Sequence, residues 1–428
     1  MGMIYRLRDV RLEPEGRVQD LCLRDGHLEE CADGLPGVEI EGNGGLLLPG
    51  MIDPHVHLRT PGMEAAENWD TGTRAAARGG VTTVLDMPNT RPPTTTRQRL
   101  AEKRALAAAA RVNWGLHFGA TATNLPEIAA VENIASVKAY QGSSTGDLLL
   151  DEDEALARLF KAAAAADMPV TLHAEDEGII RERAASLPED ADVHLHGWAR
   201  PPEAAASAVK RALALAQETG ATLYFCHVST AAELELIRPA KAAGMPIYVE
   251  ATPHHLFLDE RDLATLGNYG KVNPPLRSPE DRKALWEALL DGTVDTIGTD
   301  HAPHPREAKE RPYREAPSGM PGLEVALPLL LTAVLDGRIP FSLLAPLTSE
   351  RAARIFGIQP AGWVLADIVT PRALAPEEIE SRCGWSPYTG RVLRGWPQYV
   401  WVNGELVLDA GAFTPQAPGR EVAFRHNR

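Results

Sequence analysis

The sequence has few cysteines, no long apolar run and no excess of positive charge, and each shortage excludes a class of protein. No segment approaches the roughly 18 uninterrupted apolar residues that a membrane helix needs, so no membrane partner is expected. Lysine and arginine total 43 against 58 aspartates and glutamates, a formal net charge of −15. A protein that binds nucleic acid would instead show a basic patch, so no nucleic-acid partner is expected.

The cysteines are scattered along the chain and include no CxxC pair. There are four of them: Cys22, Cys31, Cys226 and Cys383. The N-terminus also lacks the charged-then-apolar pattern of a secretory leader. We therefore expect a reduced protein located in the cytoplasm.

The chain is long enough for a large core, with 428 residues of which 44% are hydrophobic. Residues 1–46 contain short strand-like runs separated by turn signals, and this pattern returns after Phe356. Between these regions, short apolar runs alternate with alanine-rich helical stretches, which is typical of a parallel sheet. The sequence predicts an α/β fold: a TIM-type (β/α)8 barrel over 47–356, and a small β-sandwich domain formed by both chain ends, 1–46 plus 357–428.

Eight apolar runs are candidate barrel strands, and the chemistry of such a barrel is located at their C-terminal ends. These runs cover residues 46–57, 81–88, 112–121, 135–140, 169–174, 222–228, 246–251 and 294–300. Helices are expected at 68–79, 96–110, 153–166, 203–220, 231–244 and 278–292. Gly220, Gly244 and Gly292 lie just past helical runs, where a left-handed C-cap is favoured.

Side chains able to bind metal recur at the ends of these strands. The first strand ends in DPHVHLR, where Asp53, His55 and His57 share one face because side chains alternate along a strand. The other strand-end residues are Lys138, His173, His227 and Asp300. A single histidine there is more often a packed residue, and an aspartate is often a helix cap. The joint pattern favours a metal site, with Asp53 supporting the histidines as an outer residue.

Lys138 differs from the others, because an ammonium group cannot bind a cation. One interpretation is a salt bridge to Asp300 or Glu175. The other is that burial favours the neutral amine, to which carbon dioxide adds as a carbamate that bridges two metal ions. The site would then hold two divalent cations, with zinc favoured and manganese or cobalt as alternatives. Such a pair holds a hydroxide at neutral pH and polarises a carbonyl group, so the predicted chemistry is hydrolysis.

Asp300 has two candidate roles in such a binuclear site. The predicted ligands are His55, His57 and Asp300 for one ion, His173 and His227 for the other, and carbamylated Lys138 between them. Asp300 is also placed to take a proton from the hydroxide and pass it to a leaving nitrogen. The alternative is that Asp300 is a ligand only.

Taken together, these motifs resemble the amidohydrolase superfamily in its cyclic amidase branch, and within it the dihydroorotases of the lysine-containing type. The resemblance covers essentially the whole chain. It depends on the segments DPHVHLRTPG, MPNTRPP, VKAYQGSSTG, HAED, CHVST, EATPHHL, VNPPLR and TDHAPH. It implies reversible hydrolysis of the cyclic amide of (S)-dihydroorotate to N-carbamoyl-L-aspartate, in de novo pyrimidine synthesis.

The resemblance also implies a set of substrate-binding residues. Arg59, Asn89 and His304 would bind the ring carboxylate, Arg59 through a two-pronged hydrogen bond, and Asn273 would contact the ring. Each of the first three has an ordinary alternative: a surface cation for Arg59, a turn residue for Asn89 and a packed loop histidine for His304.

Two other functions stay open. Hydantoinases, dihydropyrimidinases and allantoinases act on substrates without the ring carboxylate, which would leave Arg59 and His304 without a role. A catalytically inactive scaffold for aspartate transcarbamoylase would be expected to have lost metal ligands. A homo-oligomer, and an active enzyme that docks to a transcarbamoylase, also stay open.

The remaining histidines and one cysteine near the predicted site are expected to be structural. His254 and His255 follow the seventh strand and are expected to support the site from outside. His194 and His196 form a second HxH triplet but lack a preceding apolar strand, so they are expected in a loop. Cys226 precedes His227 and is expected to point away from it, into the core.

Overall fold

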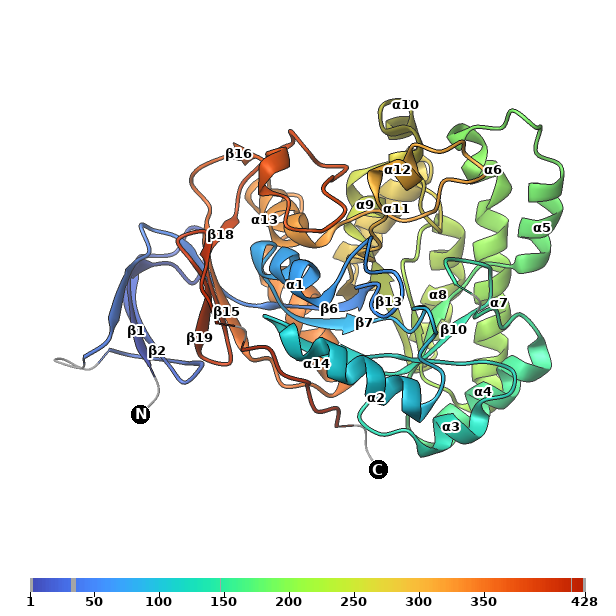
Figure 1. Ribbon diagram of the computed structural model, residues 1–428, viewed down its shortest axis with the longest axis horizontal. Coiled ribbons are helices and arrows are strands. Elements are labelled where there is room, and N and C mark those ends of the chain that lie inside the picture. Colours follow the sequence, from blue (N-terminus) through green and yellow to red (C-terminus); the bar gives the residue numbers. More distant parts are fainter. Residues whose placement is uncertain (1–2, 32–35, 147, 417, 426–428) are drawn as a thin grey trace.

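The computed structural model describes residues 3–31, 36–146, 148–416 and 418–425. Figure 1 shows a barrel of strands surrounded by helices, with a group of strands from both chain ends beside it at the left. The blue strands of the N-terminal region lie next to the red strands of the C-terminal region. The predicted fold class, a barrel with a β-sandwich formed by both chain ends, is confirmed.

The barrel strands pair in parallel along the chain order. They are β6 (Met51–Val56), β7 (Val81–Asp86), β8 (Asn113–Leu116), β9 (Phe118–Gly119), β10 (Val137–Tyr140), β11 (Val170–His173), β12 (Leu223–Phe225), β13 (Ile247–Ala251) and β14 (Thr296–Ile297). The barrel closes where Val56 forms a parallel bridge with His301 and His57 N donates to His301 O at 2.8 Å. This closure places the C-terminal ends of the first and last strands side by side.

Two of the expected strands are divided. The run 46–57 splits into β5 (Leu46–Pro49), which pairs with β15 (Gly362–Asp367) outside the barrel, and β6 within it. The run 112–121 splits into β8 and β9 around His117, whose Nε2 lies 2.9 Å from Pro54 O. The division of the chain at residues 46 and 357 stays a prediction.

The helices cover the outside of the barrel (Figure 1). They are α1 (Trp69–Arg78), α2 (Arg97–Leu106), α3 (Leu125–Ala130), α4 (Asp153–Ala165), α5 (Glu177–Ala185), α6 (His196–Ala199), α7 (Pro202–Thr219), α8 (Ala231–Ala242), α9 (Pro253–Phe257), α10 (Leu263–Leu266), α11 (Pro279–Leu290), α12 (Arg306–Lys309), α13 (Ala326–Leu335) and α14 (Arg351–Phe356). The six predicted helices correspond to α1, α2, α4, α7, α8 and α11. Gly220, Gly244 and Gly292 have φ of 72°, 81° and 81°, so the predicted left-handed conformation is confirmed.

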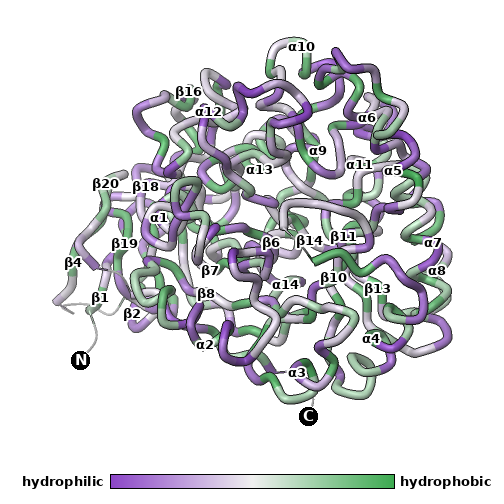
Figure 2. The backbone as a smooth tube through the Cα atoms, turned by 45° about the vertical axis from the view of Figure 1, so that its right-hand side comes forward, coloured by the Kyte–Doolittle hydropathy of each residue, from purple (hydrophilic) through white to green (hydrophobic). Residues whose placement is uncertain are grey.

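Helix surfaces alternate in polarity, as packing against the barrel requires. Hydrophilic and hydrophobic segments alternate along the outer helices in Figure 2. In α7, for example, Ala205, Val209, Ala212 and Ala216 are buried at spacings of three and four residues. None of the described helices is long and apolar enough to cross a membrane.

The sandwich consists of two sheets. One has the order β3 (His27–Glu29), β2 (Gln19–Arg24), β1 (Ile4–Val10) and β4 (Val38–Glu41). The other has the order β20 (Ala412–Phe413), β19 (Glu405–Asp409), β18 (Trp396–Val402), β15 and β5. A buried cluster joins the sheets, and within it the rings of Tyr5 and Trp401 lie 5.8 Å apart. Cys22 of β2 forms a disulfide with Cys31, so the expectation that all four cysteines are reduced is wrong.

Residues 374–391 extend from the small domain to the mouth of the barrel. They lie between the paired strands β16 (Arg372–Ala373) and β17 (Val392–Leu393). Trp385 Nε1 donates to His304 O at 2.8 Å, and the Ser381 hydroxyl donates to Glu67. This segment near the C-terminal end of the sequence therefore supports the loop that follows the last barrel strand.

Candidate metal centre

All but two of the predicted site residues meet in one cavity at the C-terminal ends of the barrel strands. The cavity is lined by His55, His57, Arg59, Asn89, Lys138, Tyr140, Ser144, Thr145, His173, His227, Asn273, Asp300, Ala302, Ser318 and Gly319. Asp53 and His304 are the predicted site residues outside this lining. Asp53 contacts the backbone of His55, and His304 contacts the side chain of Arg59.

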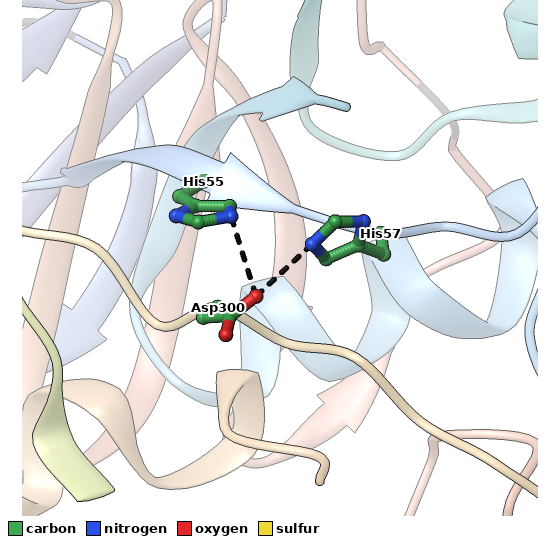
Figure 3. A group of neighbouring side chains, drawn as sticks. All are labelled: His55, His57 and Asp300. Atoms are coloured by element: carbon green, nitrogen blue, oxygen red, sulfur yellow. Dashed lines mark hydrogen bonds and ion pairs between the residues drawn. The ribbon is translucent and has the colours of Figure 1, made fainter. Parts of the chain in front are cut away.

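His55, His57 and Asp300 form the first candidate metal site (Figure 3). Asp300 Oδ1 lies 3.3 Å from His55 Nε2 and 3.0 Å from His57 Nε2. Ligand atoms of a tetrahedral zinc ion lie about 3.3 Å apart when each bond to the metal is about 2.0 Å long. Both distances match the spacing of ligands to one cation, and the three ligand atoms all lie within 4.8 Å of one another.

Hydrogen bonds on the far side of each ring set the histidine tautomers. His55 Nδ1 lies 2.8 Å from Glu250 Oε1, and His57 Nδ1 lies 2.7 Å from Asn89 Oδ1. The amide of Asn89 donates through Nδ2 to Thr145 O at 2.8 Å, so its oxygen faces His57. Each Nδ1–H therefore donates, and each Nε2 lone pair points at the carboxylate. Three converging acceptor atoms repel one another unless a cation lies among them, so the residues fit a metal ion.

Burial keeps these imidazoles neutral. Desolvation is the main cause that lowers the pKa of His55, His57 and His227 well below the ordinary value. The pKa of His173 is also lowered, again chiefly by burial. A neutral imidazole is the form that binds a metal ion.

His173 and His227 form a second pair. His173 Nδ1 lies 3.0 Å from His227 Nε2, and His173 Nε2 lies 2.9 Å from Glu175 Oε2. Burial alone would raise the pKa of Glu175, but Arg200 and His173 hold that pKa well below its ordinary value. A charged Glu175 accepts the proton of His173 Nε2 and leaves Nδ1 available for a cation.

Lys138 is fully buried and lines the same cavity. Its Nζ donates to Cys226 Sγ at 2.9 Å and lies 5.0 Å from the centre of the Tyr140 ring. Within the described ranges no carboxylate forms an ion pair with Lys138, and Glu175 pairs with Arg200 instead, which contradicts the salt-bridge interpretation. Cys226 is buried in a hydrophobic cluster, as expected, but its thiol also contacts Lys138, so it does not point away from the candidate site.

Three residues of the cavity have a left-handed backbone. Arg59, His227 and Asp300 have φ of 61°, 36° and 46°. This conformation costs a residue other than glycine about 1 kcal/mol or more. Each of the three follows a barrel strand, where the turn of the chain directs the side chain into the cavity.

Asp53 joins the first and last strands behind the candidate ligands. Its Oδ1 accepts hydrogen bonds from His55 N at 3.1 Å and from Thr299 N at 3.0 Å, and its Oδ2 accepts from the Thr299 hydroxyl. Burial raises the pKa of Asp53 to about 7, against the lowering effect of these hydrogen bonds. The contacts agree with the predicted supporting position of Asp53.

Arg59 is a buried cation with an unused donor. Its Nε donates to Pro303 O at 3.2 Å, its Nη2 lies 3.1 Å from His304 Nε2, and its Nη1 has no hydrogen-bond partner. Burial lowers the pKa of Arg59 to about 10, so the guanidinium stays charged at neutral pH. Of the carboxylates in the described ranges, none pairs with it. This environment fits an anionic group of a ligand and contradicts a surface position for Arg59.

Asn273 is held by a histidine that was expected in a loop. His196 Nε2 lies 2.9 Å from Asn273 Oδ1, and His196 Nδ1 lies 3.0 Å from Tyr313 Oη. His196 is buried at the start of α6, so the expectation of a loop residue is wrong, whereas His194 is exposed. His255 has the expected structural environment, because its Nδ1 lies 2.8 Å from the hydroxyl of Thr252.

Glu250, on β13, is a site residue that was not predicted. Its Oε1 accepts from His55 Nδ1 at 2.8 Å and from His227 N at 2.9 Å, and its Oε2 accepts from the Tyr224 hydroxyl at 2.9 Å. Glu250 thus contacts one residue of each candidate metal site. Its position near the end of the seventh strand, in EATPHHL, was the available signal.

The sequence is similar to that of known proteins along nearly its whole length. The sequence matches the Amidohydrolase family over residues 46–407. It is 40% identical over 422 residues to the dihydroorotase of Halobacterium salinarum, covering 94% of this chain and 96% of that protein. It is 38% identical over 435 residues to the dihydroorotase of Thermus aquaticus, covering 96% and 100% of the two chains. The chain belongs to the amidohydrolase family, in its dihydroorotase branch.

Solved structures of other cyclic amidases resemble this amidohydrolase. The L-hydantoinase (dihydropyrimidinase) of Arthrobacter aurescens has a TM-score of 0.90 and 29% identity, covering 99% of this chain and 100% of that one. The dihydropyrimidinase of Brevibacillus agri has a TM-score of 0.90 and 28% identity, covering 99% of both. The fold is therefore shared with hydantoinases, whereas the identity to the two dihydroorotases is higher.

Proposed function

We propose that this amidohydrolase is a dihydroorotase. It hydrolyses the cyclic amide of (S)-dihydroorotate reversibly to N-carbamoyl-L-aspartate. The reverse reaction closes the ring and is a step of pyrimidine synthesis. The observation that carries the proposal is the buried, unneutralised Arg59 beside His304, at the edge of a cavity with two groups of metal-binding side chains. The identity of 38–40% to dihydroorotases over nearly the whole chain supports it.

The proposed cofactors are two divalent cations, most simply zinc, because the donor atoms are imidazole nitrogens and carboxylate oxygens. One ion would be held by His55, His57 and Asp300, and the other by His173 and His227. When bound, the two ions supply an activated water and polarise the carbonyl group that it attacks.

Lys138 is the proposed bridge between the two sites. Its Nζ is buried and has no acidic partner among the described residues. The neutral amine adds to carbon dioxide and releases a proton, which leaves a carbamate with two oxygens. This anion would balance the charge of the cations and has the two donor atoms that a bridge requires.

Asp300 is the proposed proton carrier. Its carboxylate lies in the cavity, where Oδ1 faces both His55 and His57. We infer that Asp300 takes the proton of the attacking water and transfers it to the ring nitrogen as the amide bond breaks. Its backbone is left-handed, with a φ of 46°, and its side chain lines the cavity.

The substrate carboxylate would bind to Arg59 and His304, and Asn273 would contact the ring. Arg59 has a free Nη1 donor for this purpose. Asn89 lines the cavity, but both ends of its amide form hydrogen bonds within the protein. These contacts favour an orienting role toward His57, and the predicted contact of Asn89 with the substrate stays a prediction.

The alternative functions fit less well. A hydantoinase, dihydropyrimidinase or allantoinase would leave Arg59 as a buried cation without a counter-charge. An inactive scaffold for aspartate transcarbamoylase would not need the candidate ligands, yet all six are present: His55, His57, Lys138, His173, His227 and Asp300. A cytoplasmic location, a homo-oligomer and a complex with aspartate transcarbamoylase stay predictions. Light scattering of the protein alone, and mixed with a transcarbamoylase, tests the last two.

Replacement of Arg59 tests the proposed function. We expect Arg59→Met to lower kcat/KM for dihydroorotate by about 100-fold or more, because a charge-assisted two-pronged contact is lost. Arg91→Met is the matched control, since Arg91 is exposed, and it should leave turnover unchanged. Unchanged turnover of dihydroorotate by Arg59→Met would contradict the proposal.

A further inference from the structure

Lys309 is buried and forms hydrogen bonds to three main-chain carbonyls. Its side chain is 1% exposed, and its Nζ lies 3.1 Å from Lys271 O, 2.9 Å from Pro317 O and 2.9 Å from Gly319 O. In the part of the chain that the structure describes, no carboxylate pairs with it. By contrast, the buried Lys103 pairs with Asp86 at 2.6 Å.

The three carbonyls identify the charge of Lys309. Burial, together with the positive charges of Lys271 and Arg59, lowers its pKa. A neutral amine, however, has two N–H donors and a lone pair, and the lone pair would face the third oxygen. An ammonium group has a donor for each carbonyl, so this geometry favours the charged form.

Lys271 has a similar environment. Its Nζ donates to Tyr313 O and Ala316 O, both at 2.6 Å, and lies 4.3 Å from the centre of the Tyr313 ring. Burial lowers its pKa to about 8, with Arg200 adding to the effect, so it is still mostly charged at neutral pH. No carboxylate in the described ranges forms an ion pair with it.

Lys271 and Lys309 both lie behind one wall of the cavity, and this wall also contacts His304, the neighbour of Arg59. Ser318 and Gly319 line the cavity, Ser318 O lies 3.0 Å from His304 Nε2, and Gly319 N donates to Lys271 O at 2.9 Å. The positive charges of Arg59 and Lys309 also lower the pKa of His304, after burial itself. This wall therefore has three buried cations and no acidic partner for any of them in the described part of the chain.

We propose that Lys271 and Lys309 are specificity-determining residues of the carboxylate subsite. Their charges act on the substrate carboxylate through the wall formed by Ser318 and Gly319, without touching it, because a low-dielectric interior screens charges weakly. They favour cyclic amides with a carboxylate on the ring over uncharged ones. The inference depends on the proposed function, since it assigns the ligand of the cavity as a carboxylate.

A comparison of a charged and an uncharged ligand tests this role. The probes are dihydroorotate, by its KM, and dihydroorotamide, by its Ki as a competitive inhibitor of dihydroorotate hydrolysis. The amide has nearly the same shape but no charge. We expect Lys309→Met and Lys271→Met each to raise the KM for dihydroorotate about tenfold, while the Ki of the amide changes by less than about twofold. The ratio of Ki to KM should therefore fall about tenfold.

Controls separate this electrostatic role from a structural one. Lys210→Met removes an exposed lysine and should leave the ratio unchanged. If Lys309→Met does not fold, as judged by its thermal melting curve, Lys271→Met carries the test. If the ratio of Ki to KM is unchanged in a folded variant, the inference is overturned. This includes the case in which the binding of both ligands is weakened equally. If the wild-type protein does not hydrolyse dihydroorotate, the proposed function itself fails. That result differs from failure of the inference, in which the wild-type protein is active and the variants keep its ratio of Ki to KM.

Discussion

Asp53 and Thr299 join the first and last strands of the barrel through two hydrogen bonds. Asp53 accepts from both the main-chain N–H and the hydroxyl of Thr299, and it also accepts from His55 N. Thr299 precedes Asp300, so this single carboxylate holds the backbone next to two candidate ligands of one metal ion. The spacing between His55 and Asp300 depends on it.

Removal of the Asp53 carboxylate should therefore weaken metal binding. We predict that Asp53→Ala lowers metal affinity about 10- to 100-fold and destabilises the fold by about 2 kcal/mol, because buried N–H groups lose their acceptor. Asp53→Asn keeps one acceptor oxygen and should lose less of both. Metal titration and urea unfolding measure the two effects. Equal metal affinity in Asp53→Ala and wild type would show that Asp53 does not position the ligands.

Glu250 should control both candidate metal sites, because it contacts the side chain of His55 and the backbone of His227. We predict that Glu250→Gln lowers the affinity for the metal ions about 10- to 100-fold. The exposed Glu235→Gln is the control and should bind metal normally. Metal content after dialysis against a weak chelator is the measurement. Full retention of metal by Glu250→Gln would exclude this role.

Trp385 should affect substrate binding more than the chemical step. Its indole donates to His304 O at 2.8 Å, and Trp385→Phe removes that hydrogen bond while keeping an aromatic ring. We predict a rise in KM for dihydroorotate of about three- to tenfold with kcat changed less than about twofold. Trp286→Phe is a matched control, because Trp286 Nε1 also donates to a carbonyl, that of Leu256. A fall in kcat with constant KM would contradict the prediction.

Glu324 should make stability fall as the pH rises. Burial raises its pKa to about 8, against the hydrogen bonds from Ser381 N and Glu380 N, so the folded state keeps a proton that the unfolded state loses near pH 4.5. Between these pH values the folded state binds more protons, and the Glu324 contribution to stability decreases by about 1.4 kcal/mol per pH unit.

The variant Glu324→Gln isolates this effect, because its side chain does not ionise. Relative to wild type, it should be increasingly stable from pH 5 to pH 8, as measured by urea unfolding at several pH values. A difference between the two proteins that is constant with pH would show that the pKa of Glu324 is not raised.

The candidate ligands could be predicted because a parallel barrel brings all strand ends to one rim. His55, His57, His173, His227 and Asp300 each lie at the end of an apolar run, so their meeting requires only the correct strand count. Lys138, like His55, lies inside its strand rather than after it.

The contacts behind the ligands could not be predicted in the same way. Glu250 matters because His55 and His227 approach it from other strands, and periodicity along one strand does not show which strands are neighbours at that depth. His196 was expected in a loop because no apolar strand precedes it, and its contact with Asn273 could not be predicted because Asn273 is distant in the sequence. Similarly, the contact of Cys226 with Lys138 joins two different strands, so the pattern along one strand does not show it. The disulfide between Cys22 and Cys31 depends on the pairing of β2 with β3.

The most direct test of the central claim is a parallel assay of the purified, zinc-loaded protein with dihydroorotate, hydantoin and allantoin. We predict that kcat/KM for dihydroorotate exceeds that for the other two by at least about 100-fold, because only dihydroorotate has a carboxylate for Arg59. Preference for hydantoin or allantoin would contradict the assignment as a dihydroorotase and would leave the metal sites to be explained by another cyclic amidase.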